Sequence, residues 1–369
     1  MKKILQFSLL SLFVTLFNQN ISAQGCVAVR HMSSAAGSGA NSTSMMRPGQ
    51  WQVSAGMRSL YSHRHFVGTE YQEGRTIANT EVKNWSQGMD IGITYSVTDR
   101  LSVSVNIPLA SNLRDSKYEH LGNGTTAAPN PYFTTKSAGL GDIRVGASYW
   151  LLDPLKYSKG NVSLGLGIKA PTGNSNVQGD FHRLDTEKKD YTITKAVDQS
   201  IQLGDGGWGV NLEIQGYQVI TSNASFYYNG FYMLNPQNTN DTYANPVTKE
   251  NVQNPITVKH SIADQFAARA GVAYALIPKY GIAVSFGGRV EGVPSLDILG
   301  LSEGFRRPGY IISVEPGISY MNKKNTFALN LPIATTRNRT RSYSDLKNGG
   351  QGDAAFADYF FSATYSHRF

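Results

Sequence analysis

The chain has 369 residues, of which 37 are Gly, 20 Tyr and 16 Phe, and only 16% are charged. Its formal charge of +8 becomes +6 when a leader containing Lys2 and Lys3 is removed. A charge this small, spread over loops, indicates contact with anionic lipid headgroups and argues against nucleic-acid binding. The single cysteine excludes an intramolecular disulfide, so strand pairing or packing must hold the fold.

The N-terminus has the order of a secretory signal peptide. Lys2 and Lys3 precede an apolar run over residues 9–17, and small residues follow up to Ala23. The run is shorter than the roughly 20 apolar residues of a membrane-spanning helix. We therefore predict that residues 1–23 are cleaved. Cys26 raises lipidation as an alternative, but Gln24 stands where lipoprotein signals prefer a small residue, which favours an unmodified thiol.

The mature chain alternates with a period of two. Odd positions over residues 89–97 are apolar, and the residues between them are Gly, Asp, Thr or Ser. The same pattern returns over residues 101–109 after a tight turn. This predicts a hairpin with one apolar and one polar face. No later stretch could form a transmembrane helix, so the chain can enter a membrane only as strands.

Connection lengths distinguish a membrane barrel from a soluble sandwich, which would also alternate. Twelve strands are predicted near 50–63, 86–98, 101–111, 139–152, 161–170, 200–219, 224–234, 261–276, 280–291, 309–320, 326–333 and 357–369. Five connections are short, at 99–100, 153–160, 220–223, 277–279 and 321–325, and the other six have roughly 17 to 29 residues. Short periplasmic turns and long extracellular loops predict an all-β, antiparallel, up-and-down transmembrane barrel over residues 49–369. Its location is the outer membrane of a Gram-negative bacterium, with both termini in the periplasm.

The last strand places aromatic residues on one face and ends on Phe369. Its alternating residues are Tyr359, Phe361, Ala363, Tyr365, His367 and Phe369. A terminal Phe after alternating aromatics resembles the signal read by the barrel assembly machinery. That machinery is therefore an expected partner, together with outer-membrane lipid and lipopolysaccharide.

The face opposite the apolar one supplies the candidate functional residues. Counting alternate positions along each predicted strand gives the charged residues on this inward face: Arg144, Lys169, Glu213, Arg269, Arg289, Glu291, Glu315, Asp358 and Arg368. Neighbouring strands would bring Arg269, Arg289, Glu291 and Glu315 into a cross-strand charge ladder. These residues either form a constriction that selects solutes or fill a narrow barrel.

Residues 24–48 are rich in Ser, Gly and Ala, and they either plug the barrel or extend flexibly into the periplasm. Enzymatic and metal sites find little support: His63 with His65, and Asp180 and His182 with Asp185 and Glu187, lack specific spacing. The paired glycines lack the helix and Lys of a phosphate loop. We expect no enzyme activity and no cofactor.

Two segments carry a family resemblance. Residues 139–146, Gly-Leu-Gly-Asp-Ile-Arg-Val-Gly, and residues 164–173, which end in Pro171-Thr172-Gly173, resemble the outer-membrane family named for the meta-pathway of phenol degradation. The resemblance covers about residues 139–220, residues 304–310 are a candidate subfamily feature, and the leader resembles those of Bacteroidetes exports. The family resemblance implies that the chain is an outer-membrane transporter or channel, and it assigns no binding residue. Uptake of small aromatic or otherwise hydrophobic compounds is the resulting hypothesis.

Two functions therefore stay open. The chain is either a passive channel or transporter, supported by its inward charges and long loops, or a structural, surface-interacting barrel with a closed lumen. The sequence does not name the solute or the oligomeric state.

Overall fold

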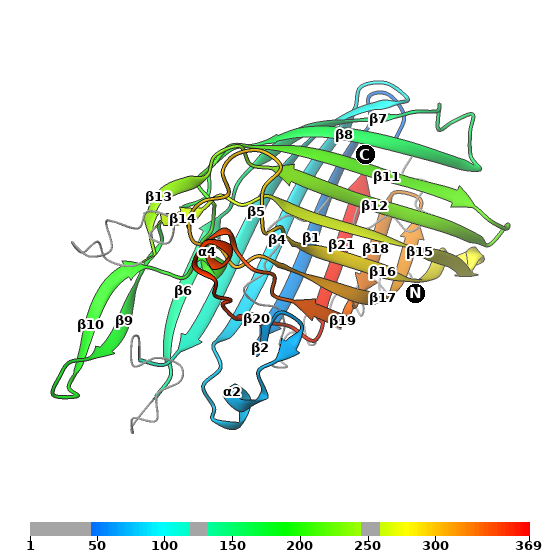
Figure 1. Ribbon diagram of the computed structural model, residues 1–369. Coiled ribbons are helices and arrows are strands. Elements are labelled where there is room, and N and C mark those ends of the chain that lie inside the picture. The colour runs from blue at the N-terminus through cyan, green and yellow to red at the C-terminus, as the bar shows by residue number, and fades with distance from the viewer. Residues whose placement is uncertain (1–45, 119–130, 245–258) are drawn as a thin grey trace.

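The computed structural model describes residues 46–118, 131–244 and 259–369. Within these ranges, twelve antiparallel strands form a closed barrel, because β16, the first strand of the sheet path, also pairs with β17, the twelfth. Figure 1 shows this barrel with its small sheets and its short α-helices gathered at one end. The barrel strands are β1 (Trp51–Ser62), β4 (Lys83–Ser96), β5 (Leu101–Ser116), β7 (Arg144–Trp150), β8 (Gly160–Lys169), β11 (Gly209–Val219), β12 (Ala224–Leu234), β15 (Gln265–Ile277), β16 (Ile282–Val293), β17 (Gly309–Asn322), β18 (Asn325–Asn330) and β21 (Phe360–Arg368).

Two further strands extend the barrel wall, and short sheets lie beyond it. The wall extensions are β6 (Phe133–Leu140), which pairs with β5, and β19 (Ile333–Asn338), which pairs with β17. The smaller sheets join β9 (Gln178–Leu184) to β10 (Asp190–Ala196), β13 (Thr239–Tyr243) to β14 (Lys259–Ser261), and β20 (Ala354–Phe356) to β2 (Arg64–Val67) and β3 (Glu70–Tyr71). The helical elements are α2 (Glu73–Ile77), α4 (Tyr343–Asn348), η3 (Gln199–Ile201) and η4 (Pro278–Tyr280).

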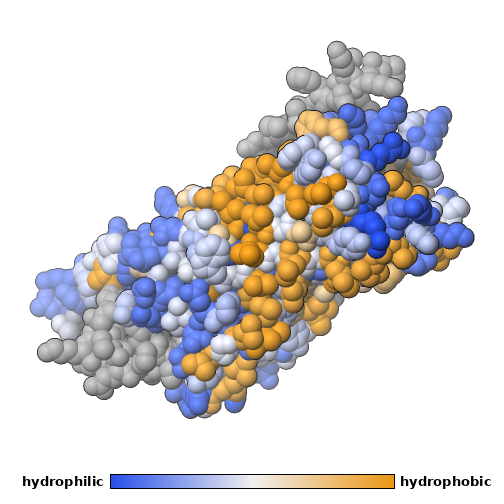
Figure 2. Space-filling view, turned by 90° about the horizontal axis from the view of Figure 1, so that it is seen from above, coloured by the Kyte–Doolittle hydropathy of each residue, from blue (hydrophilic) through white to orange (hydrophobic). Residues whose placement is uncertain are grey.

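The period of two separates a lipid-facing surface from a filled interior. On β8, Leu164, Leu166 and Ile168 are 48%, 60% and 55% exposed, whereas Ser163 and Lys169 are buried. Figure 2 shows hydrophobic atoms gathered along the middle of the barrel and hydrophilic atoms toward its ends. Exposed apolar side chains in such a band are the mark of a surface that meets hydrocarbon. Among the described residues, no helix is long and apolar enough to span a membrane.

The predicted alternation of short turns and long loops is confirmed. The five short connections lie at one end of the barrel with residue 51 and the C-terminus, and all the small sheets lie beyond the other end. By the rule for bacterial barrels, the short-turn end is periplasmic and the other end extracellular. On β21 and the residues that flank it, Tyr359, Phe361, Tyr365 and Phe369 are exposed on the outer face. Their recognition by the assembly machinery stays a prediction.

Three predicted strands are wrong in detail. The strand expected at 139–152 is two strands, because β6 ends at Leu140 and β7 begins at Arg144. The strand expected at 200–219 begins only at Gly209, since Asp198 caps the short helix η3 through the backbone of Ser200. The strand expected at 326–333 is broken at residues 331–332, where Pro332 cannot donate a hydrogen bond.

The predicted leader, residues 1–23, and most of the predicted plug or tail, residues 24–48, lie outside the described residues. Described structure begins at Met46, whose carbonyl accepts a hydrogen bond from Ser96. Whether the remainder enters the lumen stays a prediction.

Candidate functional site

One half of the barrel interior contains a continuous ladder of ion pairs. Arg269 and Arg289 lie directly opposite each other on β15 and β16, an arrangement that would repel without a counter-charge. Glu315 of β17 supplies it, with its two oxygens 2.7 Å from the Arg269 guanidinium and 3.4 Å from that of Arg289. Glu291 bonds Arg289 at 2.6 Å and also pairs with Arg58 of β1. We call these five side chains the ion-pair ladder.

Aromatic side chains close the space around this ladder. The guanidinium carbons of Arg58 and Arg289 lie 4.1 and 5.1 Å from the ring centre of Phe360, which is 1% exposed. Tyr227 is buried against Gly271 and Gly287, where a Cβ would lie 2.7 and 2.9 Å from its hydroxyl. The two glycines make room for this ring. This half of the interior is therefore packed, as the interpretation of a filled narrow barrel expects.

The opposite half holds more widely separated polar pairs. Arg144 of β7 bonds Asp90 of β4 at 3.2 Å, and Lys169 of β8 pairs with Asp205. Glu213 of β11 accepts a hydrogen bond from Asn211. These pairs line the wall from β4 to β11, and an open space lies beside Asp90, Arg144 and Lys169.

This space is a cavity of about 110 Å³. Arg58, Asp90 and Arg144 line it from inside the barrel. Gln87 and Leu109, whose side chains alternate to the outer face of β4 and β5, line it as well. Residues from both faces can line one cavity only where the wall is interrupted.

The interruption is the gap between β6 and β7. β5 pairs with β7 up to Asn106 and with β6 from Leu109 onward, and Pro108 lies where the partner changes. Here Pro108 accepts a hydrogen bond from Gly141 at 2.8 Å through its carbonyl. We call residues 141–143 together with Pro108 the wall gap.

The two sequence motifs of the family resemblance build this gap. Thr172 donates to the Gly141 carbonyl and accepts from the Ile143 amide, both at 2.8 Å. The Asp142 carboxylate accepts from the Gly173 amide at 2.9 Å and from the Asp205 amide at 3.1 Å. These bonds satisfy backbone groups that an interrupted strand would otherwise leave unpaired.

Position 173 requires glycine, because the backbones of Gly173 and Gly204 lie very close together at the wall gap. A Cβ on Gly173 would lie 2.8 Å from backbone atoms of Gly204, closer than real Cβ contacts. The Gly-Leu-Gly-Asp and Pro-Thr-Gly segments are thus one hydrogen-bonded corner, which holds the wall open instead of continuing the strand.

A second, smaller cavity of about 50 Å³ lies on the extracellular side of the first. Most of its lining residues have polar side chains, among them Ser200, Gln202, His260 and Arg306. Ser200, Gln202 and Asp205 line both cavities. The segment containing η3 therefore separates an outer chamber from the inner one.

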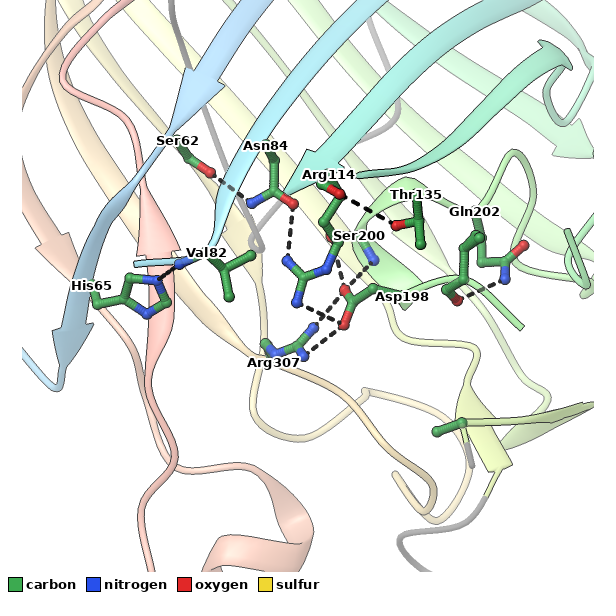
Figure 3. Close-up of polar contacts among 12 residues, drawn as sticks. Ser62, His65, Val82, Asn84, Arg114, Thr135, Asp198, Ser200, Gln202 and Arg307 are labelled. Atoms are coloured by element: carbon green, nitrogen blue, oxygen red, sulfur yellow. Dashed lines mark hydrogen bonds and ion pairs between the residues drawn. The ribbon is translucent and has the colours of Figure 1, made fainter. Parts of the chain in front are cut away.

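Ion pairs between loops hold this segment in place, as Figure 3 shows. Asp198 binds Arg307 through two contacts of 2.7 Å and lies 3.3 Å from Arg114 of β5. Arg114 also donates to Asn84 of β4 at 2.9 Å. Burial alone would raise the pKa of Asp198, but Arg114 and Arg307 hold that pKa well below its usual value. The carboxylate is therefore ionised at neutral pH and ties the segment to the barrel rim.

The structure places the predicted lumen residues in two groups inside the barrel and at two positions at its ends. Arg269, Arg289, Glu291 and Glu315 form the ladder, and Arg144, Lys169 and Glu213 lie in the other half of the interior. Asp358 lies before β21 and pairs with Arg64 and Arg337 at the extracellular rim. Arg368 lies at the periplasmic end, near the Lys323 carbonyl. Their roles in transport stay predictions.

Sequence reasoning missed several residues of this region. Arg58 and Asp90 have the inward parity of their strands, and counting along β1 and β4 would have found them. Phe360 follows the aromatic outer-face residue Tyr359, so its inward position was hidden in an aromatic-rich strand. Asp198 and Arg307 come from loops far apart in the sequence, and no periodicity could have paired them.

The histidine and acidic groups have local partners. His65 is buried, donating to Asp353 at 2.8 Å through Nδ1 and accepting from the Val82 amide at 2.9 Å. His182 lies 2.9 Å from Asp190. Over residues 46–118, 131–244 and 259–369, no group of three or more His, Cys, Asp or Glu could hold a metal ion.

No family model matches the sequence, and no curated protein matches it. Among solved structures, the COG4313 outer membrane channel from Pseudomonas putida F1 aligns with a TM-score of 0.56 over 92% of this chain and 100% of its own, at 12% identity. A deletion mutant of the TodX monoaromatic hydrocarbon channel aligns with a TM-score of 0.50 over 94% and 96%, at 10% identity. The chain therefore has the fold of an outer-membrane β-barrel. With its exposed apolar band, a barrel of this kind lies in the outer membrane of Gram-negative bacteria.

Proposed function

We propose that this chain is an outer-membrane channel that admits small hydrophobic solutes, among them aromatic compounds, and releases them sideways through the wall gap. The observation that carries the proposal is the 110 Å³ cavity lined from both faces of the wall. An apolar cavity of roughly 150 Å³ can hold benzene, so a small aromatic ring is of the right order for this space.

The packed half of the interior supports sideways release. The ion-pair ladder, Phe360 and Tyr227 occupy the space through which an axial pore would have to pass. A hydrophobic solute gains nothing from a polar axial route, whereas the wall gap leads to the hydrocarbon of the membrane. The inward charges then serve mainly to fill and brace the barrel.

Two likenesses support the same class of solute. One is the sequence resemblance to the phenol meta-pathway family, and the other is the shared fold with TodX, a monoaromatic hydrocarbon channel. The Gly-Leu-Gly-Asp and Pro-Thr-Gly segments that carry the sequence resemblance are the residues that hold the gap open. We also propose that the chain is a member of that family and that it comes from a member of the Bacteroidetes.

The test fills the cavity and compares a matched change on the lipid face. Ala110 lines the cavity on β5, and Ala147 is exposed on the outer face of β7. We expect Ala110→Trp to lower toluene uptake by cells at least about fivefold, and Ala147→Trp to leave it unchanged, because only the first blocks the path. Heat-modifiable migration on gels confirms that both variants fold.

Equal uptake by the Ala110→Trp variant and the unaltered protein would overturn the proposal and favour a structural barrel. Single-channel recording separates an axial pore from sideways release. The refolded protein should give no large conductance steps in a planar bilayer, and neither should the variant in which Arg289 and Glu315 are replaced by Met and Leu. Discrete steps whose selectivity changes would instead assign the ladder to a charge-lined pore.

A further inference from the structure

Charge is distributed very unevenly between the two ends of the barrel. The turns and terminal segments at the periplasmic end contain Asp99 and Asp153 as their acidic residues, and their basic residues are Arg47, Arg100, Lys156, Lys159, Lys279, Lys323, Lys324 and Arg368. In the rest of the described chain, acidic and basic residues balance. The positive charge that the composition placed over the loops in general is therefore concentrated at the periplasmic end.

Four of these cations project from turns into solvent, and their side chains do not stabilise the turns. Lys159, Lys279, Lys323 and Lys324 are exposed, and they belong to three turns on different parts of the circumference. Other basic residues at this end have structural contacts: Arg100 donates to the Trp150 carbonyl at 2.9 Å. We call the four lysines the periplasmic rim.

Aromatic side chains mark the height of the rim relative to the membrane. Tyr157, Tyr280 and Phe369 are 54%, 60% and 61% exposed beside these turns. The Lys279 ammonium lies 5.6 Å from the ring centre of Tyr280. Exposed aromatics in a barrel lie at the membrane interface, so neighbouring ammonium groups reach the headgroup layer.

We propose that the periplasmic rim binds anionic phospholipid headgroups in the periplasmic leaflet of the outer membrane, with phosphatidylglycerol as the model ligand. The four ammonium groups complement the charge of those phosphates at the depth where the phosphates lie, since basic residues near a membrane surface are attracted to anionic lipid. The extracellular end, which would meet lipopolysaccharide, has balanced charge with buried pairs such as Arg306–Asp297. This inference is independent of the transport proposal.

The experiment titrates the refolded mature chain in neutral detergent with phosphatidylglycerol, phosphatidylethanolamine and lipopolysaccharide, and native mass spectrometry measures bound lipid. The rim variant combines Lys159→Gln, Lys279→Gln, Lys323→Gln and Lys324→Gln. A matched control removes four exposed cations at the extracellular side: Lys136→Gln, Lys188→Gln, Arg341→Gln and Lys347→Gln.

We expect the rim variant to bind phosphatidylglycerol at least about tenfold more weakly, with phosphatidylethanolamine binding unchanged, and the control to bind phosphatidylglycerol as the unaltered chain does. Unchanged phosphatidylglycerol binding by the rim variant would overturn the proposal. So would an equal loss in both variants, which would mean unspecific attraction to net charge, or a larger loss of lipopolysaccharide than of phosphatidylglycerol binding. Heat-modifiable migration confirms folding of each variant.

Discussion

The two halves of the barrel interior use charged residues in opposite ways. Between β15 and β1, five charges alternate in sign and pack against Phe360, which leaves a solid wall of side chains. Between β4 and β8, Asp90, Arg144 and Lys169 stand beside a cavity and an interrupted wall. Charged residues that point inward thus form the ion-pair ladder on one side of the barrel and line the cavity on the other. The difference arises from the wall gap and from the aromatic rings, not from the number of charges.

Removing one charge from the ion-pair ladder should have the largest effect on the free energy of unfolding. Glu291→Gln leaves Arg58 and Arg289 close together with a single remaining carboxylate, Glu315, shared with Arg269. Breaking a buried pair costs about 3–5 kcal/mol, because the partner charge stays buried without compensation. Urea unfolding in lipid vesicles measures this loss. Asp358→Asn, at the half-exposed rim, is the control and should cost much less; equal losses would contradict the distinction.

Filling the close contact at the wall gap should have the next largest effect. Gly173→Ala forces its new methyl group against the Gly204 backbone, and such overpacking typically costs about 1–3 kcal/mol. Because the same residues shape the gap, toluene uptake should fall as well. Gly350→Ala is the control, since a Cβ there meets nothing within 4 Å. An uptake rate equal to that of the control would separate the gap from transport.

A smaller effect is expected from the loop ion pair that links the two halves at the extracellular mouth. Asp198→Asn removes the charge that Arg114 and Arg307 share, at a cost of about 1.5 kcal/mol. Because the pKa of Asp198 is held well below its usual value, its stabilisation is full above about pH 4 and is lost as the pH falls through the folded-state pKa. Hydrogen exchange of residues 198–205 should therefore speed up in the variant at neutral pH. Unchanged exchange would show that η3 is held by other contacts.

The smallest effect concerns His65, a buried residue of β2 in the sheet that β2 forms with β20 and β3. Burial lowers the pKa of His65, and its Nε2 accepts the Val82 amide, a bond that only the neutral ring can make. A lowered histidine pKa favours folding at higher pH, so stability is lost as the pH falls below about 6.5. Hydrogen exchange at the Val82 amide should rise between pH 7 and 5. A flat profile in that window would contradict this assignment.

The sequence predicted the regular parts of this molecule and not the irregular ones. Period-two alternation located the hairpins, including the strand at 224–234, because each strand in a membrane barrel must present an apolar face to lipid. The same alternation runs through residues 139–152, so it could not show that Gly141 interrupts the wall. Parity identified Arg289 and Glu315 as inward, whereas the contact of Asp198 with Arg307 depends on loop conformation, which periodicity does not encode.

A reversible closure of the wall gap shows whether solutes leave the barrel through the wall. A Cβ on Gly141 would lie 3.4 Å from the Pro108 Cβ, close to the spacing of about 3.5–4.5 Å in disulfides. In a Cys26→Ser background, Pro108→Cys with Gly141→Cys should therefore form a bridge within the wall gap under oxidising conditions, beside the cavity that both positions line. Mass spectrometry confirms the bridge, and toluene uptake is measured before and after reduction. If solutes leave through the wall, uptake is low in the oxidised protein and recovers on reduction; equal uptake in both states, with the bridge formed, would contradict release through the wall.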